Sequence, residues 1–194
     1  MGHGLENSWA LILGASSGFG EAAALELSSH GMNIFGVHLD RKSTMPKVEE
    51  IKEKIKAKGR EVAFFNINAA DPEQRSKTLG EIEQILDEHK NPSGIKVLMH
   101  SLAFGTLKPY IAESEKDRVS NKNMDMTLDV MAHSLVYWAQ EIVARKMMVE
   151  GGSRVPHTSI GGRASQAQDH GERDTGRSHG DARSQQDTGQ RGDY

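Results

Sequence analysis

Cysteine is absent from this chain of 194 residues, which excludes disulfide bonds and metal sites built on thiolates. No run of apolar residues approaches the length of about 18 that a membrane-spanning helix needs. The formal net charge is −3, and no clustered excess of basic residues suggests a nucleic-acid surface. We therefore expect neither a membrane nor a nucleic acid as partner, and a cytoplasmic protein by default.

Apolar side chains are scarce, with 36% hydrophobic and 5% aromatic residues, and the shortage is concentrated at the C-terminal end. The only apolar side chains in residues 156–194 are Ile160, Ala164, Ala167, Ala182 and Tyr194. Such a segment cannot offset the backbone entropy lost on folding, roughly 1–2 kcal/mol per residue. We predict one folded domain over residues 1–155 and a disordered, low-complexity tail over residues 156–194. The tail's three histidines follow no compact ligand spacing, so no metal site is predicted from His157, His170 and His179.

Short apolar runs alternate with amphipathic stretches through the first domain. Strands are predicted at 9–13, 33–38, 61–65 and 96–100. Helices are predicted at 21–30, from Pro46 to Gly59, from Asp71 onward, and along a later stretch whose buried face would be Leu128, Met131, Leu135, Trp138 and Ile142. Repeated strand–helix alternation implies right-handed crossovers and a doubly wound parallel sheet of the α/β class. Ser153 to Val155 is expected to begin a fifth strand, after which the pattern stops, so the fold is predicted to be incomplete.

A glycine-rich turn lies between the first strand and the first helix. Close approach of a pyrophosphate to backbone amides at a helix N-terminus requires residues without side chains, and the helix dipole favours an anion there. Two serines add hydroxyl donors. The position in the first turn of an alternating fold predicts a dinucleotide site formed by Gly14, Ser16, Ser17, Gly18, Phe19 and Gly20.

The spacing G-x-x-x-G-x-G resembles the short-chain dehydrogenase/reductase family, and the resemblance extends from Trp9 to Val155. It implies a Rossmann-like fold and binding of NAD(H) or NADP(H). Asn68 and Ala69 match the adenine-contacting segment of that family, although Asp71 as a helix N-cap would also explain this stretch.

Two further segments look like the enoyl-acyl-carrier-protein reductase branch: His100-Ser101-Leu102-Ala103, and residues 129–135. The resemblance implies cofactor contacts from Ser101, Leu102 and Ala103, and hydride transfer to a fatty enoyl thioester carried on acyl carrier protein. It also implies a homo-oligomer for complete relatives. A 3-oxoacyl reductase or another short-chain reductase remains an alternative.

The choice of cofactor depends on the residues that follow the second predicted strand. An NAD site places a carboxylate there for the ribose, but the corresponding position is nearer His38 than Asp40. Arg41 and Lys42 are suited to a 2′-phosphate through charge-assisted hydrogen bonds. We therefore predict NADPH, with NADH as the alternative if Asp40 reaches the ribose.

The resemblance also implies a tyrosine and a nearby lysine after the fifth strand, and this pair is missing. The last lysine is Lys146, and the only later tyrosine is Tyr194. Tyr137 lies in an amphipathic helix, where packing explains it better than catalysis. No catalytic residue is therefore predicted. The abrupt change after Val155 suggests a truncated or frameshifted product, so a non-catalytic nucleotide-binding remnant and a chain that does not fold stably are competing hypotheses.

Overall fold

The computed structural model describes residues 4–88, 94–150 and 153–154 of the chain. Four strands form one sheet in the order β3-β2-β1-β4, and every neighbouring pair is parallel. The strands are β1 (Trp9–Leu13), β2 (Asn33–His38), β3 (Val62–Asn66) and β4 (Ile95–His100). All four lie within a residue of the predicted runs.

The middle of the sheet consists of β1 and β2, which are buried along their whole length. Parallel strands covered by helices on both faces need apolar side chains in both directions, which explains the continuous apolar run of β1. The Trp9 and Phe35 rings stack with centroids 3.9 Å apart. This contact fixes the two central strands against each other on one face.

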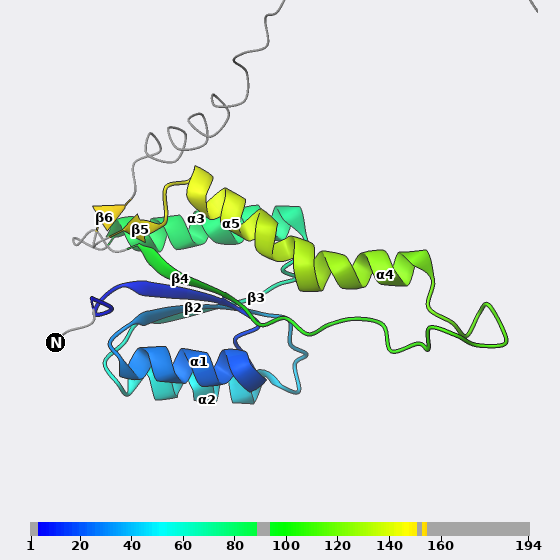
Figure 1. Cartoon of the computed structure of the whole chain (residues 1–194). Helices are drawn as coiled ribbons and strands as arrows, with labels where there is room; N and C mark the ends of the chain where they lie inside the picture. Colours follow the sequence, from blue (N-terminus) through cyan, green and yellow to red (C-terminus); the bar gives the residue numbers. More distant parts are fainter. Residues whose placement is uncertain (1–3, 89–93, 151–152, 155–194) are drawn as a thin grey trace, which may run out of the picture. The chain divides into compact units, whose positions relative to one another are not determined.

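Helices cover both faces of the sheet (Figure 1). α1 (Gly18–Ser29) and α2 (Met45–Lys56) pack on one face, where Ile12, Ile34 and Ile51 are buried. α3 (Pro72–Glu88) and α5 (Ser134–Ala144) pack on the other face. The predicted doubly wound parallel sheet is confirmed.

Two predicted helix ends are confirmed by their backbone geometry. α1 is followed by Gly31 at φ +88°, a left-handed conformation that favours glycine. α3 begins after Asp71, whose Oδ1 accepts hydrogen bonds from the amides of Glu73 and Gln74, each at 2.9 Å. These bonds satisfy N–H groups that the first turn of a helix leaves without a partner.

The later helix differs from the prediction because it is not a continuous α-helix. It consists of α4 (Asn121–Leu128), a π-helical turn η1 (Asp129–His133) and α5. Trp138 and Ile142 are buried as predicted, whereas Leu128, Met131 and Leu135 are 44%, 44% and 39% exposed. Leu128 precedes the wider π turn and Met131 lies within it, so their angular positions differ from those on a continuous α-helix. Nothing in the structure explains the exposure of Leu135, which follows the turn.

The chain beyond α5 also departs from the prediction. Met148 forms an isolated parallel bridge with Ile95, beside β4. β5 (Val149–Glu150) and β6 (Ser153–Arg154) then pair antiparallel in a separate two-stranded sheet. Ser153 therefore does not begin a strand parallel to β4, and Val155 and the predicted tail lie outside the described residues.

Within the part of the chain that the structure describes, no helix is long and apolar enough to cross a membrane. The same residues contain no group of three or more side chains arranged to hold a metal ion.

Candidate dinucleotide site

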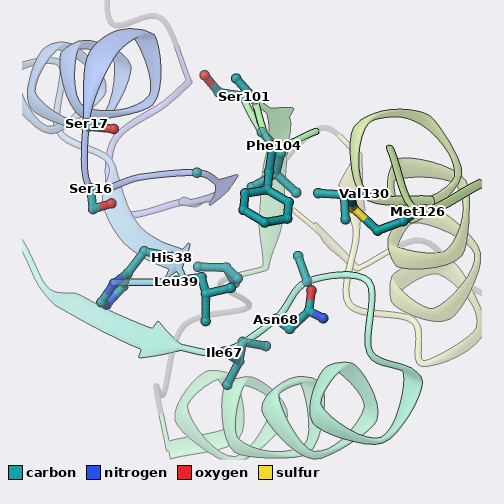
Figure 2. A pocket seen from close by; sticks show the side chains of 15 residues that line it. Ser16, Ser17, His38, Leu39, Ile67, Asn68, Ser101, Phe104, Met126 and Val130 are labelled. Atoms are coloured by element: carbon teal, nitrogen blue, oxygen red, sulfur yellow. The ribbon is translucent and has the colours of Figure 1, made fainter. Parts of the chain in front are cut away.

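A pocket of about 310 Å³ opens at the carboxyl ends of the parallel strands. This edge of a doubly wound sheet is where ligands bind, at the point where the strand order reverses between β1 and β4. Figure 2 shows Ser16 and Ser17 on one side of the pocket and Met126 and Val130 on the opposite side. The lining residues are Gly14, Ser16, Ser17, Val37, His38, Leu39, Ile67, Asn68, Ala69, Ser101, Leu102, Ala103, Phe104, Met126 and Val130.

The glycine-rich turn has the geometry that close backbone approach requires. Gly14 has φ +91°, and a Cβ built on it would lie 2.4 Å from the Ser101 carbonyl oxygen. A Cβ on Gly20 would lie 1.9 Å from the Gly14 carbonyl oxygen. The missing side chains therefore let the first turn of α1 and the end of β4 lie directly against the end of β1.

The N-terminus of α1 is suited to an anion. The N-cap residue Ser17 is extended, and its side chain makes no capping hydrogen bond. The first amides of α1 therefore lack the usual side-chain acceptor, and the positive end of the helix dipole faces the same side. A pyrophosphate is the group that such a turn accommodates.

A hydrogen-bond network closes the pocket at the end of β2. His38 Nδ1 donates to Asp40 Oδ2 at 3.0 Å, and Thr44 Oγ1 donates to Asp40 Oδ1 at 2.7 Å. Burial lowers the pKa of His38, although the bond to Asp40 opposes this effect. Burial of Asp40 opposes ionisation, yet hydrogen bonds from Ser16, Thr44 and His38 hold its pKa below the ordinary value. Asp40 is thus an ionised carboxylate that accepts hydrogen bonds on both oxygens from within the protein.

The loop between β3 and α3 forms the floor of the pocket. The Asn68 side-chain oxygen accepts a hydrogen bond from the Ala70 backbone amide at 3.1 Å. The backbone amide of Asn68 donates to Gln74 Oε1, also at 3.1 Å. The buried Trp138 indole donates to the Ala69 carbonyl oxygen at 2.9 Å. A side chain of α5 thereby fixes a loop that lines the pocket.

The structure brings together most of the predicted cofactor-binding residues. Eight of them line the pocket: Gly14, Ser16, Ser17, Asn68, Ala69, Ser101, Leu102 and Ala103. Gly18, Phe19, Gly20 and Arg41 are not among the lining residues. Gly20 lies against the Gly14 carbonyl, outside the pocket lining. Phe19 is 84% exposed, and Arg41 lies on the exposed loop after β2.

Sequence reasoning missed seven lining residues. Four of them lie at or just beyond the carboxyl ends of β2 and β3: Val37, His38, Leu39 and Ile67. Because ligands of a doubly wound sheet bind at the carboxyl ends of its strands, the predicted strand ends could have indicated these residues. Phe104 directly follows the predicted segment at the end of β4. Met126 and Val130 come from α4 and η1, and no local signal places that helix against the pocket.

No tyrosine or lysine occurs among these lining residues. Tyr137 instead packs beside Arg75, whose guanidinium carbon lies 5.5 Å from the ring centroid, and near the His133 ring at 6.4 Å. Tyr137 is 41% exposed, so these contacts lie at the surface and the side chain does not pack in the core as its position in an amphipathic helix predicted.

The family described as Enoyl-(Acyl carrier protein) reductase matches residues 14–171. The chain belongs to this family of short-chain dehydrogenases and reductases. The match includes the glycine-rich turn and continues past Val155 into the segment assigned to the tail.

Individual relatives differ in what they act on. The chain is 30% identical over 172 residues to 2,3-dihydro-2,3-dihydroxybenzoate dehydrogenase of Bacillus subtilis, covering 84% of this chain and 59% of that protein. It is 33% identical over 113 residues to trihydroxynaphthalene reductase of Colletotrichum orbiculare, covering 57% of this chain and 36% of that protein. Less than two thirds of either relative's length is thus represented.

The solved structure of YwfH, an NADPH-dependent reductase of bacilysin biosynthesis, has a similar fold. Its TM-score is 0.59 at 19% identity, over 74% of this chain and 54% of that one. At this identity the likeness concerns the fold alone.

Proposed function

We propose that this chain binds NADPH in the pocket at the carboxyl ends of β1, β2 and β4, as the cofactor-binding part of a short-chain reductase. The observation that supports the proposal is the pair of close approaches at Gly14 and Gly20, where a Cβ would lie 2.4 Å and 1.9 Å from a carbonyl oxygen. Together with the uncapped N-terminus of α1, they form a backbone cradle suited to the pyrophosphate. When bound, the nicotinamide supplies a hydride.

NADPH is favoured over NADH by the two cations that follow Asp40. Both oxygens of Asp40 already accept a hydrogen bond, from His38 and from Thr44, so fewer of its lone pairs face a ribose. Arg41 and Lys42 follow on the exposed loop and can meet a 2′-phosphate with charge-assisted hydrogen bonds.

Titration of the purified chain with NADPH and NADH, followed by nucleotide fluorescence, tests this proposal. We expect saturable binding with NADPH preferred, and Arg41→Ala should weaken NADPH by roughly tenfold, the usual loss for one charge-assisted bond, while leaving NADH unchanged. Lys77→Ala on the exposed side of α3 is the control and should leave both affinities unaltered. A folded chain that takes up neither nucleotide contradicts the proposal.

We further propose that a short-chain reductase whose cofactor-binding part resembles this chain transfers a hydride to a fatty enoyl thioester on acyl carrier protein. That reaction also requires the tyrosine–lysine pair, which is missing here. The family match supports this substrate class. A second candidate is oxidation or reduction of a hydroxylated cyclic compound by a short-chain enzyme of another branch, which the names of the two relatives favour. Binding of crotonyl thioester, a 3-oxoacyl thioester or trihydroxynaphthalene to the NADPH-loaded chain, read by the fluorescence of the bound nucleotide, separates the substrate classes without requiring turnover.

The described pocket lining contains no proton-donating tyrosine, so we expect nucleotide binding by this chain without turnover of any of these substrates. Such a result supports the non-catalytic nucleotide-binding module. Measurable turnover refutes it and shows that another group supplies the proton. The homo-oligomer expected for complete relatives, the division into a domain over 1–155 and a tail over 156–194, and a cytoplasmic location stay predictions.

A further inference from the structure

The π turn η1 lies where α4 leaves the pocket and α5 enters the core. Its defining bond runs from the Ser134 amide to the Asp129 carbonyl oxygen, five residues back. In an α-helix the Ser134 amide would donate to Val130 instead. The π turn therefore deprives the Val130 carbonyl of its ordinary backbone partner.

Side chains take over that partner's role. Ser134 Oγ donates to the Val130 carbonyl oxygen at 2.8 Å, and His100 Nε2 lies 2.9 Å from Ser134 Oγ and 3.3 Å from the same carbonyl. Because the hydroxyl hydrogen is used on Val130, Ser134 Oγ accepts from His100, so the imidazole bears its hydrogen on Nε2. Ser134 is fully buried. Loss of these bonds would remove the side-chain donors of a part-buried carbonyl, which is costly.

The π turn decides which side chains face the pocket. Met126 and Val130 line the pocket, Ser134 is buried, and Trp138 and Ile142 enter the core, so every fourth residue faces inward. On an α-helix, each step of four residues rotates by about 40°, and the four steps from Met126 to Ile142 would sum to about 160°. The wider turn offsets part of this rotation. Both ends of the helix can therefore face inward.

We propose that His100 and Ser134 are positioning residues that hold η1 in its π conformation and so place Val130 and Met126 in the wall of the nucleotide pocket. Figure 2 shows both side chains of that wall, Val130 and Met126, opposite the serines of the glycine-rich turn. His100 ends β4 and directly precedes Ser101, which also lines the pocket. One imidazole thus joins two walls of the pocket. The effect on affinity rests on the proposed nucleotide binding, whereas the effect on the turn does not.

The adenosine part of the cofactor is expected to meet this wall. It lies on the side of β2 and β3, where Leu39 and Ile67 offer apolar surface, and Val130 closes the same space. If η1 returns to an α-helical register, Val130 rotates away from that space. Inorganic pyrophosphate is expected to bind at the glycine-rich turn, on the opposite side of the pocket from Val130, and serves as the internal reference.

The test compares Ser134→Ala, His100→Leu and His100→Gln with Ser28→Ala. Ser28 is the matched control because it is also buried in a helix, donates to a carbonyl at 2.7 Å and accepts from a side chain, Lys58, at 3.1 Å, but lies outside the pocket. Dissociation constants for 2′,5′-ADP and pyrophosphate are measured well below each variant's unfolding temperature. The conformation of residues 129–134 is read by NMR without ligand.

We expect Ser134→Ala and His100→Leu to weaken 2′,5′-ADP by at least about fivefold and to alter the π-turn connectivities. His100→Gln, whose amide can donate near the Nε2 position, should restore most of the affinity. Ser28→Ala should lower the unfolding temperature without changing affinity, and pyrophosphate should bind all variants alike.

An unaltered π turn in Ser134→Ala would overturn the proposal, as would equal losses for 2′,5′-ADP and pyrophosphate. If the unmodified chain binds no nucleotide, the proposed function fails, and the NMR comparison still decides the role of the two side chains.

Discussion

Two glycines of the same turn should respond very differently to a single added methyl group. Gly18 has φ +56°, and a Cβ built on it would have no atom within 4 Å, so Gly18→Ala meets only backbone strain. A left-handed conformation at a residue with a Cβ costs about 1 kcal/mol. In Gly20→Ala the methyl carbon would lie 1.9 Å from the Gly14 carbonyl oxygen, well inside the 3.0 Å limit for such contacts. Because the obstacle is the backbone at the end of β1, relief requires α1 to move away from the sheet, at a cost of at least about 3 kcal/mol.

Thermal unfolding followed by circular dichroism compares the two variants. For a chain of this size each kcal/mol lowers the unfolding temperature by about 2–4 °C. Gly18→Ala should therefore unfold about 2–4 °C below the unmodified chain, and Gly20→Ala at least about 6 °C below it. Gly20→Ala should also lose NADPH binding, since its displaced helix no longer presents its amides to the pocket. Equal unfolding temperatures for the two variants would refute the close-approach argument.

Three further predictions concern the core and the pocket floor. Trp138→Phe removes the donor to the Ala69 carbonyl and part of a fully buried side chain. Chemical denaturation should therefore show a loss of about 2–4 kcal/mol in the free energy of unfolding. A loss below about 1 kcal/mol, roughly the contribution of one solvent-exposed hydrogen bond, would contradict this prediction. Gly36→Ala places a methyl group 2.5 Å from the Phe64 ring and should cost about 1–3 kcal/mol in the same assay, an effect that Phe64→Leu in the same chain should partly relieve by clearing the space. The lowered pKa of His38 means that the unfolded chain binds the proton more readily, so the free energy of unfolding should fall as the pH drops below about 6.5. His38→Gln should make this fall less steep between pH 7.5 and 5.5, roughly one pH unit on either side of the ordinary histidine pKa. An unchanged pH dependence would exclude His38 as its source.

The sheet was predictable because its signals are local and consistent. β1 is apolar at every position, as a strand covered on both faces must be. Asp71 before Pro72 marks a helix start by capping chemistry that needs no distant partner. The glycine spacing likewise reports a local requirement, which is close backbone approach around Gly14 and Gly20.

The later helix shows where local reasoning failed. The prediction assumed a constant α-helical period and buried Leu128, Met131 and Leu135, which are substantially exposed. The π turn depends on His100, which lies 34 positions before Ser134 in the sequence and meets it only when β4 packs against the helix. No periodicity within the helix contains that information.

The sequence alone determined the class of fold, the order of its strands along the chain and the place of the glycine-rich turn, because apolar period, capping residues and glycine spacing act over a few neighbouring positions. Only the tertiary structure decided that the Trp138 indole fixes Ala69 and that Val130 faces the pocket. Each of these depends on the direction of a side chain or backbone group relative to another segment, and that direction is set when the helices pack on the sheet.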